Sequence, residues 1–145
     1  MLVMGLRSLT ASALASGAAF LFNRAASRGG RPGPLLAFLL GPGVEEAAKT
    51  GFALAMAAPV VVVHLGFGAV EAVYDVSGRR GRASRSGPGF AAGAVSFLSH
   101  TAFGALTQAV LALTRQPLLA VTTAAVAHAL WNVAIVALMD AGRRS

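Results

Sequence analysis

The stretch PLLAVTTAAVAHALWNVAIVALM, residues 117–139, runs for 23 residues without an Asp, Glu, Lys or Arg. A helix of about 20 mainly apolar residues crosses the ~30 Å hydrocarbon core of a bilayer. Further apolar stretches cover residues 3–22, 34–57, 59–76 and 89–114. We therefore predict an all-α, polytopic transmembrane helix bundle of about five spans. It forms a single integral membrane domain over 1–145, and its motif-bearing core is 34–139.

The composition supports a lipid-embedded chain and excludes several other classes. Hydrophobic residues make up 56% of the 145 residues and charged residues 12%, and the mean hydropathy is +0.70. A soluble domain is about a quarter charged. The lack of cysteine excludes a disulfide framework, a thiolate metal site and a cysteine nucleophile. We expect no nucleic-acid partner despite the net charge of +7, because no basic face is interleaved with aromatic residues for base stacking.

The arginine distribution predicts the orientation in the membrane. Nine arginines fall in three regions, against two elsewhere. The three regions are residues 23–33, residues 77–88 and the C-terminal tail. Cytoplasmic loops carry the excess of Lys and Arg, so we expect an integral plasma-membrane protein with these regions cytoplasmic. Abundant arginine and alanine with one lysine is typical of a GC-rich bacterium, which would make this the inner membrane. Alternatively, 1–22 is a cleaved signal peptide, since Ala-Leu-Ala at 13–15 resembles a cleavage site, and four spans remain.

Three charged residues lie midway along the second apolar stretch: Glu45, Glu46 and Lys49. A charge at the centre of a membrane helix costs about 2.5–3.5 kcal/mol, so three together need a purpose or mutual neutralisation. Lys49 follows Glu45 by four residues and Glu46 by three, so its ammonium can reach both carboxylates on one helix face. A purely structural cluster does not explain the second carboxylate, because one lysine neutralises only one.

The third stretch carries His64, Phe67, Glu71 and Asp75 at helical spacing, on one face. Asp75 is near the cytoplasmic end, where water reaches it. Glu71 lies roughly 8 Å deep at the helical rise of ~1.5 Å per residue. His64 lies nearer the outer end, where we expect it to pack or to meet lipid headgroups.

Two later stretches place polar residues deep in the membrane. His100 lies in the fourth stretch, and His128 lies in the fifth, followed one turn later by Asn132. Trp131 is the only tryptophan, and it sits mid-span rather than at an interface. Glu45, His100 and His128 are each about 11 residues from the cytoplasmic ends of their stretches, hence roughly 16 Å deep. Independent structural residues have no cause to share a level, so we predict one buried polar site.

These residue types suit hydrolysis in a water-poor cavity. A glutamate can take a proton from water, the two histidines can assist proton transfer, and Asn132 can donate to an oxyanion. The same groups also suit a divalent metal such as Zn²⁺, because two histidines with a glutamate leave a coordination position open for water. The predicted metal ligands are Glu46, Glu71, His100 and His128. The residue pattern leaves both chemistries open.

Four motifs resemble those of the PrsW-type intramembrane proteases, a family related to the CAAX-prenyl-protease and bacteriocin-processing group. They are Glu45-Glu46-Ala47-Ala48-Lys49, Phe67 four residues before Glu71, His100-Thr101-Ala102-Phe103-Gly104, and His128-Ala129-Leu130-Trp131-Asn132. The resemblance implies that Glu45 and Glu46 activate water. It implies that His100 and His128 assist and that Asn132 supports the oxyanion. Lys49, Glu71 and Trp131 are the expected supporting residues.

The chain departs from the family pattern in three ways. Ala72 stands where the family usually has asparagine after the glutamate, and the polar loop between the first two motifs is nearly absent. The chain is also shorter than members with seven or more spans. It is then either a minimal protease or one whose site is closed by a partner or by a homo-oligomer.

The expected function is an intramembrane endopeptidase, glutamic-type or metal-dependent, that hydrolyses a peptide bond of a membrane-anchored protein substrate. Membrane lipid is its other expected partner. Two non-catalytic alternatives remain. One is a proton or ion relay built from the same titratable groups. The other is an inactive family member that serves as a binding or immunity protein.

Overall fold

The computed structural model describes residues 2–28, 33, 35–77 and 88–142, nearly all of them in helices. The elements are α1 (Leu2–Ala26), η1 (Leu36–Leu40), α2 (Gly41–Ala55), α3 (Val60–Val76), α4 (Pro88–Thr114) and α5 (Pro117–Gly142). None of the described residues lies in a strand. The predicted all-α bundle is confirmed.

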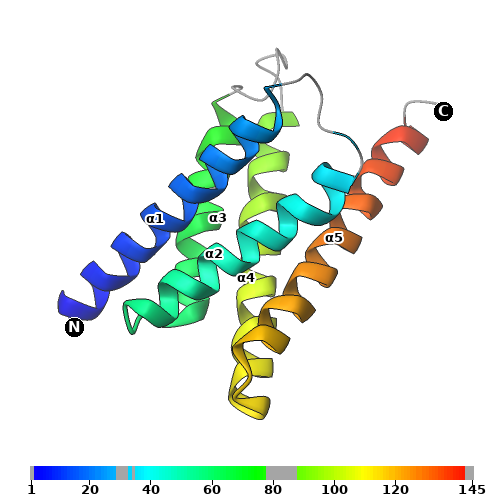
Figure 1. Ribbon diagram of the computed structural model, residues 1–145. Coiled ribbons are helices and arrows are strands. Elements are labelled where there is room, and N and C mark those ends of the chain that lie inside the picture. Colours follow the sequence, from blue (N-terminus) through cyan, green and yellow to red (C-terminus); the bar gives the residue numbers. More distant parts are fainter. Residues whose placement is uncertain (1, 29–32, 34, 78–87, 143–145) are drawn as a thin grey trace.

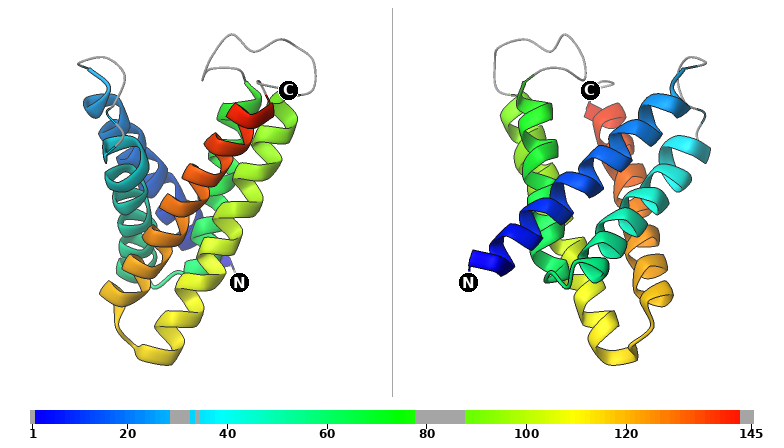
Figure 2. Two further views of the ribbon diagram at one scale, coloured as in Figure 1. Left: turned by 90° about the vertical axis from the view of Figure 1, so that its right-hand side faces the viewer. Right: turned by 60° about the vertical axis from the view of Figure 1, so that its left-hand side comes forward.

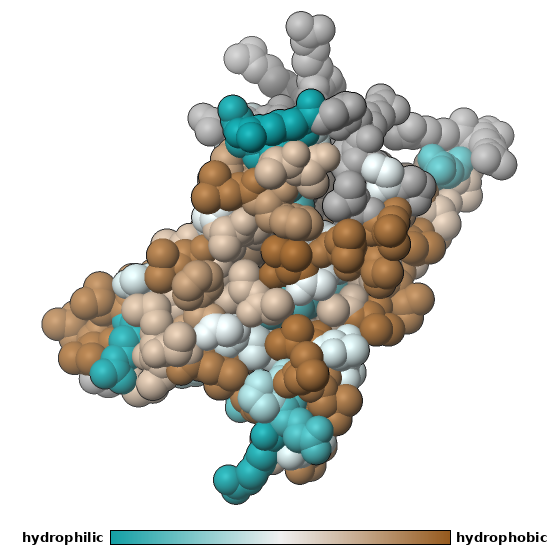
Figure 3. All heavy atoms as spheres, in the orientation of Figure 1, coloured by the Kyte–Doolittle hydropathy of each residue, from teal (hydrophilic) through white to brown (hydrophobic). Residues whose placement is uncertain are grey.

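Three of the described helices are long and apolar enough to cross a membrane: α1, the Phe90–Thr114 part of α4, and α5. Hydrophobic side chains cover most of the face shown in Figure 3, and hydrophilic ones gather toward its extremities. This is the surface that a lipid environment favours, because burial in protein is not needed to remove these side chains from water. The protein is thus a membrane protein. α2 and α3 are shorter, with 15 and 17 residues.

Successive helices run in alternate directions (Figures 1 and 2). The C-terminal ends of α1, α3 and α5 and the start of α4 lie at one end of the molecule, here called the open end. The N-terminus, the α2–α3 turn and the α4–α5 turn lie at the other. Most of the arginines that predict the orientation lie outside the described residues, at 31, 79, 80, 82, 85, 143 and 144.

A turn at Pro59 separates α2 from α3, between the apolar stretches 34–57 and 59–76. α2 ends at Ala55, Ala57 takes a left-handed φ of 48°, and Pro59 is extended (φ −61°, ψ 124°) as the N-cap of α3. Proline cannot donate a backbone hydrogen bond and disfavours helix in the residue before it, so the chain reverses here.

The apolar stretch 34–57 does not form one regular helix, because a π-helical turn, η1, precedes α2. Pro42, at the start of α2, has no N–H to donate to the carbonyl four residues earlier. Such π turns are frequent near functional sites. Here the turn directly precedes the helix that carries the two glutamates.

α3 and α4 pack closely, because glycines stand at their contact. A Cβ added at Gly68 would lie 3.0 Å from Cβ of His100, and one added at Gly104 would lie 2.5 Å from Cβ of His64. Small residues allow this approach in membrane helices, where contact rather than the hydrophobic effect holds helices together. The approach sets two histidines against the neighbouring helix.

Candidate functional site

The two adjacent glutamates of α2 face different surroundings, as the turn of about 100° per residue requires. The Glu45 side chain is 11% exposed and lines a cavity. The Glu46 side chain is fully buried and lines neither of the cavities that Glu45 lines. Glu45 is therefore the carboxylate that a substrate or water in the cavity can reach.

Glu46 accepts two hydrogen bonds and lies near a third polar group, which together come from α2, α5 and α3. Its Oε1 accepts from Nζ of Lys49, one turn along α2, at 2.5 Å, and from Nδ1 of His128 on α5 at 2.9 Å. Nδ1 of His64 on α3 lies 3.5 Å from its Oε2. Of the two contacts predicted for Lys49, the one with Glu46 is confirmed, whereas Glu45 faces the cavity instead. The ammonium and the Glu46 carboxylate are both fully buried, so each neutralises a charge that would be costly to leave unpaired away from water.

The contacts of His100 define its tautomer. Its Nδ1 is 3.0 Å from Nζ of Lys49, an ammonium that can only donate, so Nδ1 accepts. Its Nε2 contacts Oε2 of Glu71, an acceptor, so Nε2 carries the proton and donates. Ser96 also donates to this Glu71 oxygen, at 3.0 Å. Both ring nitrogens of His100 thus have partners.

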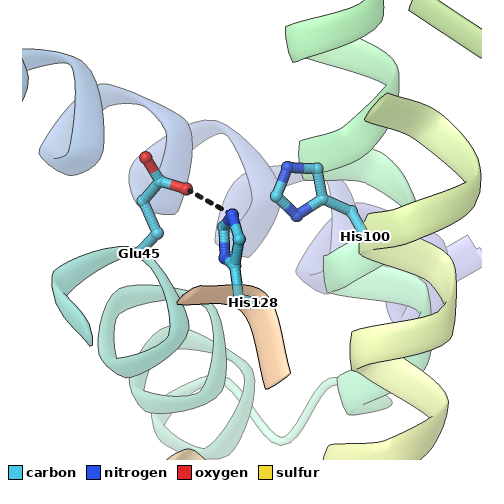
Figure 4. A group of neighbouring side chains, drawn as sticks. All are labelled: Glu45, His100 and His128. Carbon is cyan, nitrogen blue, oxygen red and sulfur yellow. Dashed lines mark ion pairs between the residues drawn. The ribbon is translucent and has the colours of Figure 1, made fainter. Parts of the chain in front are cut away.

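His128 has one nitrogen engaged and one directed at Glu45 (Figure 4). Because Nδ1 donates to the Glu46 carboxylate, Nε2 of the neutral ring is an acceptor. It lies 3.9 Å from Oε2 of Glu45, too far for a direct hydrogen bond. Two acceptors at this separation need a shared donor or a cation between them. A water molecule meets that need by donating one hydrogen to each.

Glu45, His100 and His128 come from three helices, and their nearest ligand atoms all lie within 4.8 Å of one another. They line a cavity of about 490 Å³ together with Glu71, Asn132 and Trp131. A second cavity, of about 420 Å³, lies between α1 and α3 and also reaches Glu45 and Glu71. The residues predicted from separate spans therefore meet at one place.

Aromatic rings enclose the charged groups. Nζ of Lys49 lies 4.6 Å from the centre of the Phe67 ring, a cation–π contact. Phe67 also packs edge-on against His100, with centroids 5.0 Å apart, and Phe103 stacks on His128 at 4.8 Å. These contacts hold both imidazoles in place, and phenylalanine at 67 and 103 belongs to two of the four motifs.

The structure differs from the sequence-based site in three members. The compact ligand group contains Glu45 with the two histidines. The predicted metal set contained instead Glu46, which lines neither cavity, and Glu71, which contacts Nε2 of His100 and is not part of the compact group. The reason for Glu46 is rotational, since adjacent residues on a helix cannot share a face. His64, expected to pack or to meet headgroups, is fully buried and faces Glu46. The spacing of three residues between His64 and Phe67 places both on one helix face, and this was the sequence feature that could have assigned His64 to the site.

Asn23 is a contributor that sequence reasoning missed. The region 23–33 was predicted as a loop, but α1 continues to Ala26 and carries Asn23 into the bundle. Its Nδ2 donates to Oε1 of Glu45 at 3.2 Å. This bond turns the other oxygen of Glu45 toward His128. A polar residue directly after an apolar stretch usually indicates the end of a helix. Nothing in the local sequence pattern therefore indicated that Asn23 contacts Glu45.

Comparison with protein-family models, curated proteins and solved structures finds no match to this chain.

Proposed function

We propose that the protein is an intramembrane endopeptidase that hydrolyses a peptide bond of a membrane-anchored protein with a water activated by Glu45. One observation carries the proposal. Oε2 of Glu45 and the unprotonated Nε2 of His128 are two acceptors 3.9 Å apart at the wall of a cavity of about 490 Å³. That arrangement suits the binding and polarisation of one water molecule in a cavity whose wall carries further polar side chains, among them Glu71, His100 and Asn132.

The chemistry follows from these contacts. Glu45 takes a proton from the bound water as the water oxygen attacks the carbonyl carbon of the substrate. The carbonyl oxygen gains negative charge, and the amide of Asn132 at the same cavity donates to it. The C–N bond then breaks, and the proton passes to the leaving amine. Glu46 orients His128 by accepting from its Nδ1, which keeps the acceptor Nε2 directed at the water, as a buried carboxylate orients the histidine of a catalytic triad.

A divalent cation would find its donors in Glu45, His128 and His100. Bound there, it would lower the pKa of its water and supply Lewis-acid catalysis. Glu46 fits this use, because carboxylates often hold the second nitrogen of a metal-binding histidine. His100 does not fit, because both of its nitrogens already have partners. The contacts therefore favour water activated by the glutamate without a metal.

A chelator tests this choice. Activity of the purified protein on a single-span reporter should persist after treatment with EDTA or phenanthroline, and metal analysis should find well below one zinc per chain. The reason is the saturated hydrogen bonding of His100. One tightly held zinc per chain, lost together with activity on chelation, would contradict this expectation.

The choice of substrate draws on the four motifs. Their order and their placement on separate helices resemble the PrsW-type proteases, which implies a membrane-anchored protein substrate. The arginine bias supports a plasma-membrane location with the open end cytoplasmic.

A proton or ion relay is the second candidate, and a specific observation favours it. Polar contacts run without interruption from Glu71 through His100, Lys49 and Glu46 to His128. However, Glu71 at one end and His128 at the other line the same cavity. A transport path must join the two faces of the membrane, whereas this chain of contacts begins and ends at the same cavity. The contacts therefore support hydrolysis over transport.

The deciding experiment compares wild type with Glu45→Gln on a single-span reporter in proteoliposomes. The substitution keeps the side-chain volume and removes the base, so kcat should fall by about 10²–10⁴-fold with little change in KM. Asp140→Asn is the matched control, because Asp140 is an exposed carboxylate in the last turns of α5. Near wild-type cleavage by Glu45→Gln would disprove the mechanism. Proton flux without cleavage by wild type would support the relay.

A further inference from the structure

His64 is the third buried histidine, and the proposed reaction does not use it. It lies on α3, its side chain is fully buried, and neither ring nitrogen has a hydrogen-bond partner among the described residues. Oε2 of Glu46 is also buried without a partner in that part of the chain. Nδ1 of His64 and this oxygen lie 3.5 Å apart.

Two buried polar atoms without partners are rare, because each loses its bonds to water and gains none. Here the two face each other, and one can be a donor while the other can only accept. A separation of 3.5 Å is a few tenths of an ångström beyond the usual N–H···O range of about 2.7–3.2 Å. A small movement of either side chain makes the bond.

We propose that His64 is a positioning residue that donates from Nδ1 to Oε2 of Glu46. The proposal rests on the proposed function, in which Glu46 orients His128. Oε1 of Glu46 already serves Lys49 and His128. A donor on Oε2 stops the carboxylate from rotating, so Oε1 stays at Nδ1 of His128 and Nε2 stays directed at the water.

The packing around His64 suits this role. α4 approaches the ring so closely at Gly104 that an added Cβ would lie 2.5 Å from Cβ of His64 and 2.9 Å from its Cγ. The ring therefore has little room to turn away from α2. Nδ1 of His64 is itself buried, so neither water nor lipid competes for it.

A matched pair of variants separates a donor from a packing group. His64→Asn places an amide nitrogen near the position of Nδ1. Leucine has almost the same shape as asparagine, so His64→Leu keeps the packing of the Asn variant but lacks a donor. On the single-span reporter, the Asn variant should keep kcat within about threefold of wild type. The Leu variant should lose on the order of tenfold or more in kcat with KM unchanged, because only orientation of a catalytic group is lost.

Two outcomes overturn the proposal. Equal, near wild-type kcat in both variants would mean that His64 does not act through Glu46. Equal loss in both would mean that the ring is needed for its packing rather than for its donor. Melting temperatures of both variants in detergent accompany the kinetics, so that unfolded protein is not mistaken for inactive protein.

A spectroscopic readout tests His64 without any peptidase activity. The chain has three histidines, so ¹⁵N-histidine spectra of the full-length protein are simple, and the spectrum of His64→Asn identifies the His64 signals. We expect a protonated Nδ1 whose shift changes in Glu46→Gln and not in Asp140→Asn. An unprotonated Nδ1 would overturn the proposal even if wild type cleaves the reporter. A protonated Nδ1 in a protein that cleaves nothing would support the contact while the proposed function fails.

Discussion

At the scale of single residues, the site depends on the different positions of Glu45 and Glu46. Glu45 borders the cavity and is held by Asn23, whereas Glu46 is fully buried among Lys49, His128 and His64. A buried carboxylate with a buried ammonium is stable only as a pair, because removing one partner leaves an uncompensated charge. Among the groups of the site, Glu46 and Lys49 therefore depend on each other for charge neutralisation.

This balance predicts a compensation between two substitutions. Glu46→Gln and Lys49→Met should each destabilise the protein by about 3 kcal/mol, because each leaves one buried charge unpaired. The double variant should be more stable than either single variant, since no buried charge is left without its partner. Unfolding in detergent measures all three.

The same variants also test the role of Glu46. Glu46→Gln should lose activity while still inserting into the membrane, because a neutral amide accepts from Nδ1 of His128 more weakly than a carboxylate and orients the ring poorly. Additive destabilisation in the double variant would show that the two side chains do not form the pair. Activity near wild type in Glu46→Gln would make this residue structural.

At the scale of elements, the close approach of α3 and α4 places the histidines. The approach depends on glycine at positions 68 and 104, where a side chain would meet His100 and His64. The atoms met at Gly104 are Cβ and Cγ, which a rotamer change moves little. The helices themselves would have to separate to admit a methyl group.

Gly104→Ala should therefore destabilise the protein by about 1–3 kcal/mol, the usual cost of overpacking. Gly51→Ala is the control, since its Cβ would meet nothing within 4 Å. In mid-helix that change should stabilise by about 0.5–1 kcal/mol through helix propensity. Reversible unfolding in detergent compares the two. Equal effects would mean that α3 and α4 do not pack through Gly104.

At the scale of the whole molecule, the cavity of the site lies toward one end. The cavity is lined by the last turns of α1, the start of α2, the first half of α4 and the later turns of α3 and α5, all toward the open end. Toward the α2–α3 turn an apolar cluster closes the bundle, made of Ala11, Ala53, Ala58, Val60 and Val63. Water and substrate should thus enter from the side that the arginine bias predicts to be cytoplasmic.

Cysteine labelling tests that orientation on a chain that has no cysteine of its own. Cysteines introduced at Ser84 and Ser145 should resist a membrane-impermeant reagent in intact cells and react after lysis, because both lie in the arginine-rich regions. A cysteine at Gln116, in the α4–α5 turn at the opposite end, should react in intact cells. Labelling of position 84 or 145 before lysis would reverse the topology.

Much of the fold and part of the site could be read from the sequence. The apolar stretches and Pro59 mark the helices and the α2–α3 turn, because the bilayer sets helix length and proline ends a helix. The contact of Lys49 with Glu46 follows from spacing within one helix. These inferences hold because each needs only local geometry or distance along a helix.

Other features depended on how the helices are rotated and packed against one another. Helices that are apolar on nearly every side show no single inward face, since lipid accepts the same side chains as the protein interior. Local spacing therefore could not assign Glu45 to the cavity, His64 to Glu46, or Asn23 to Glu45. Those pairings arise from contacts between residues far apart in the chain, which close packing at Gly68 and Gly104 brings within reach.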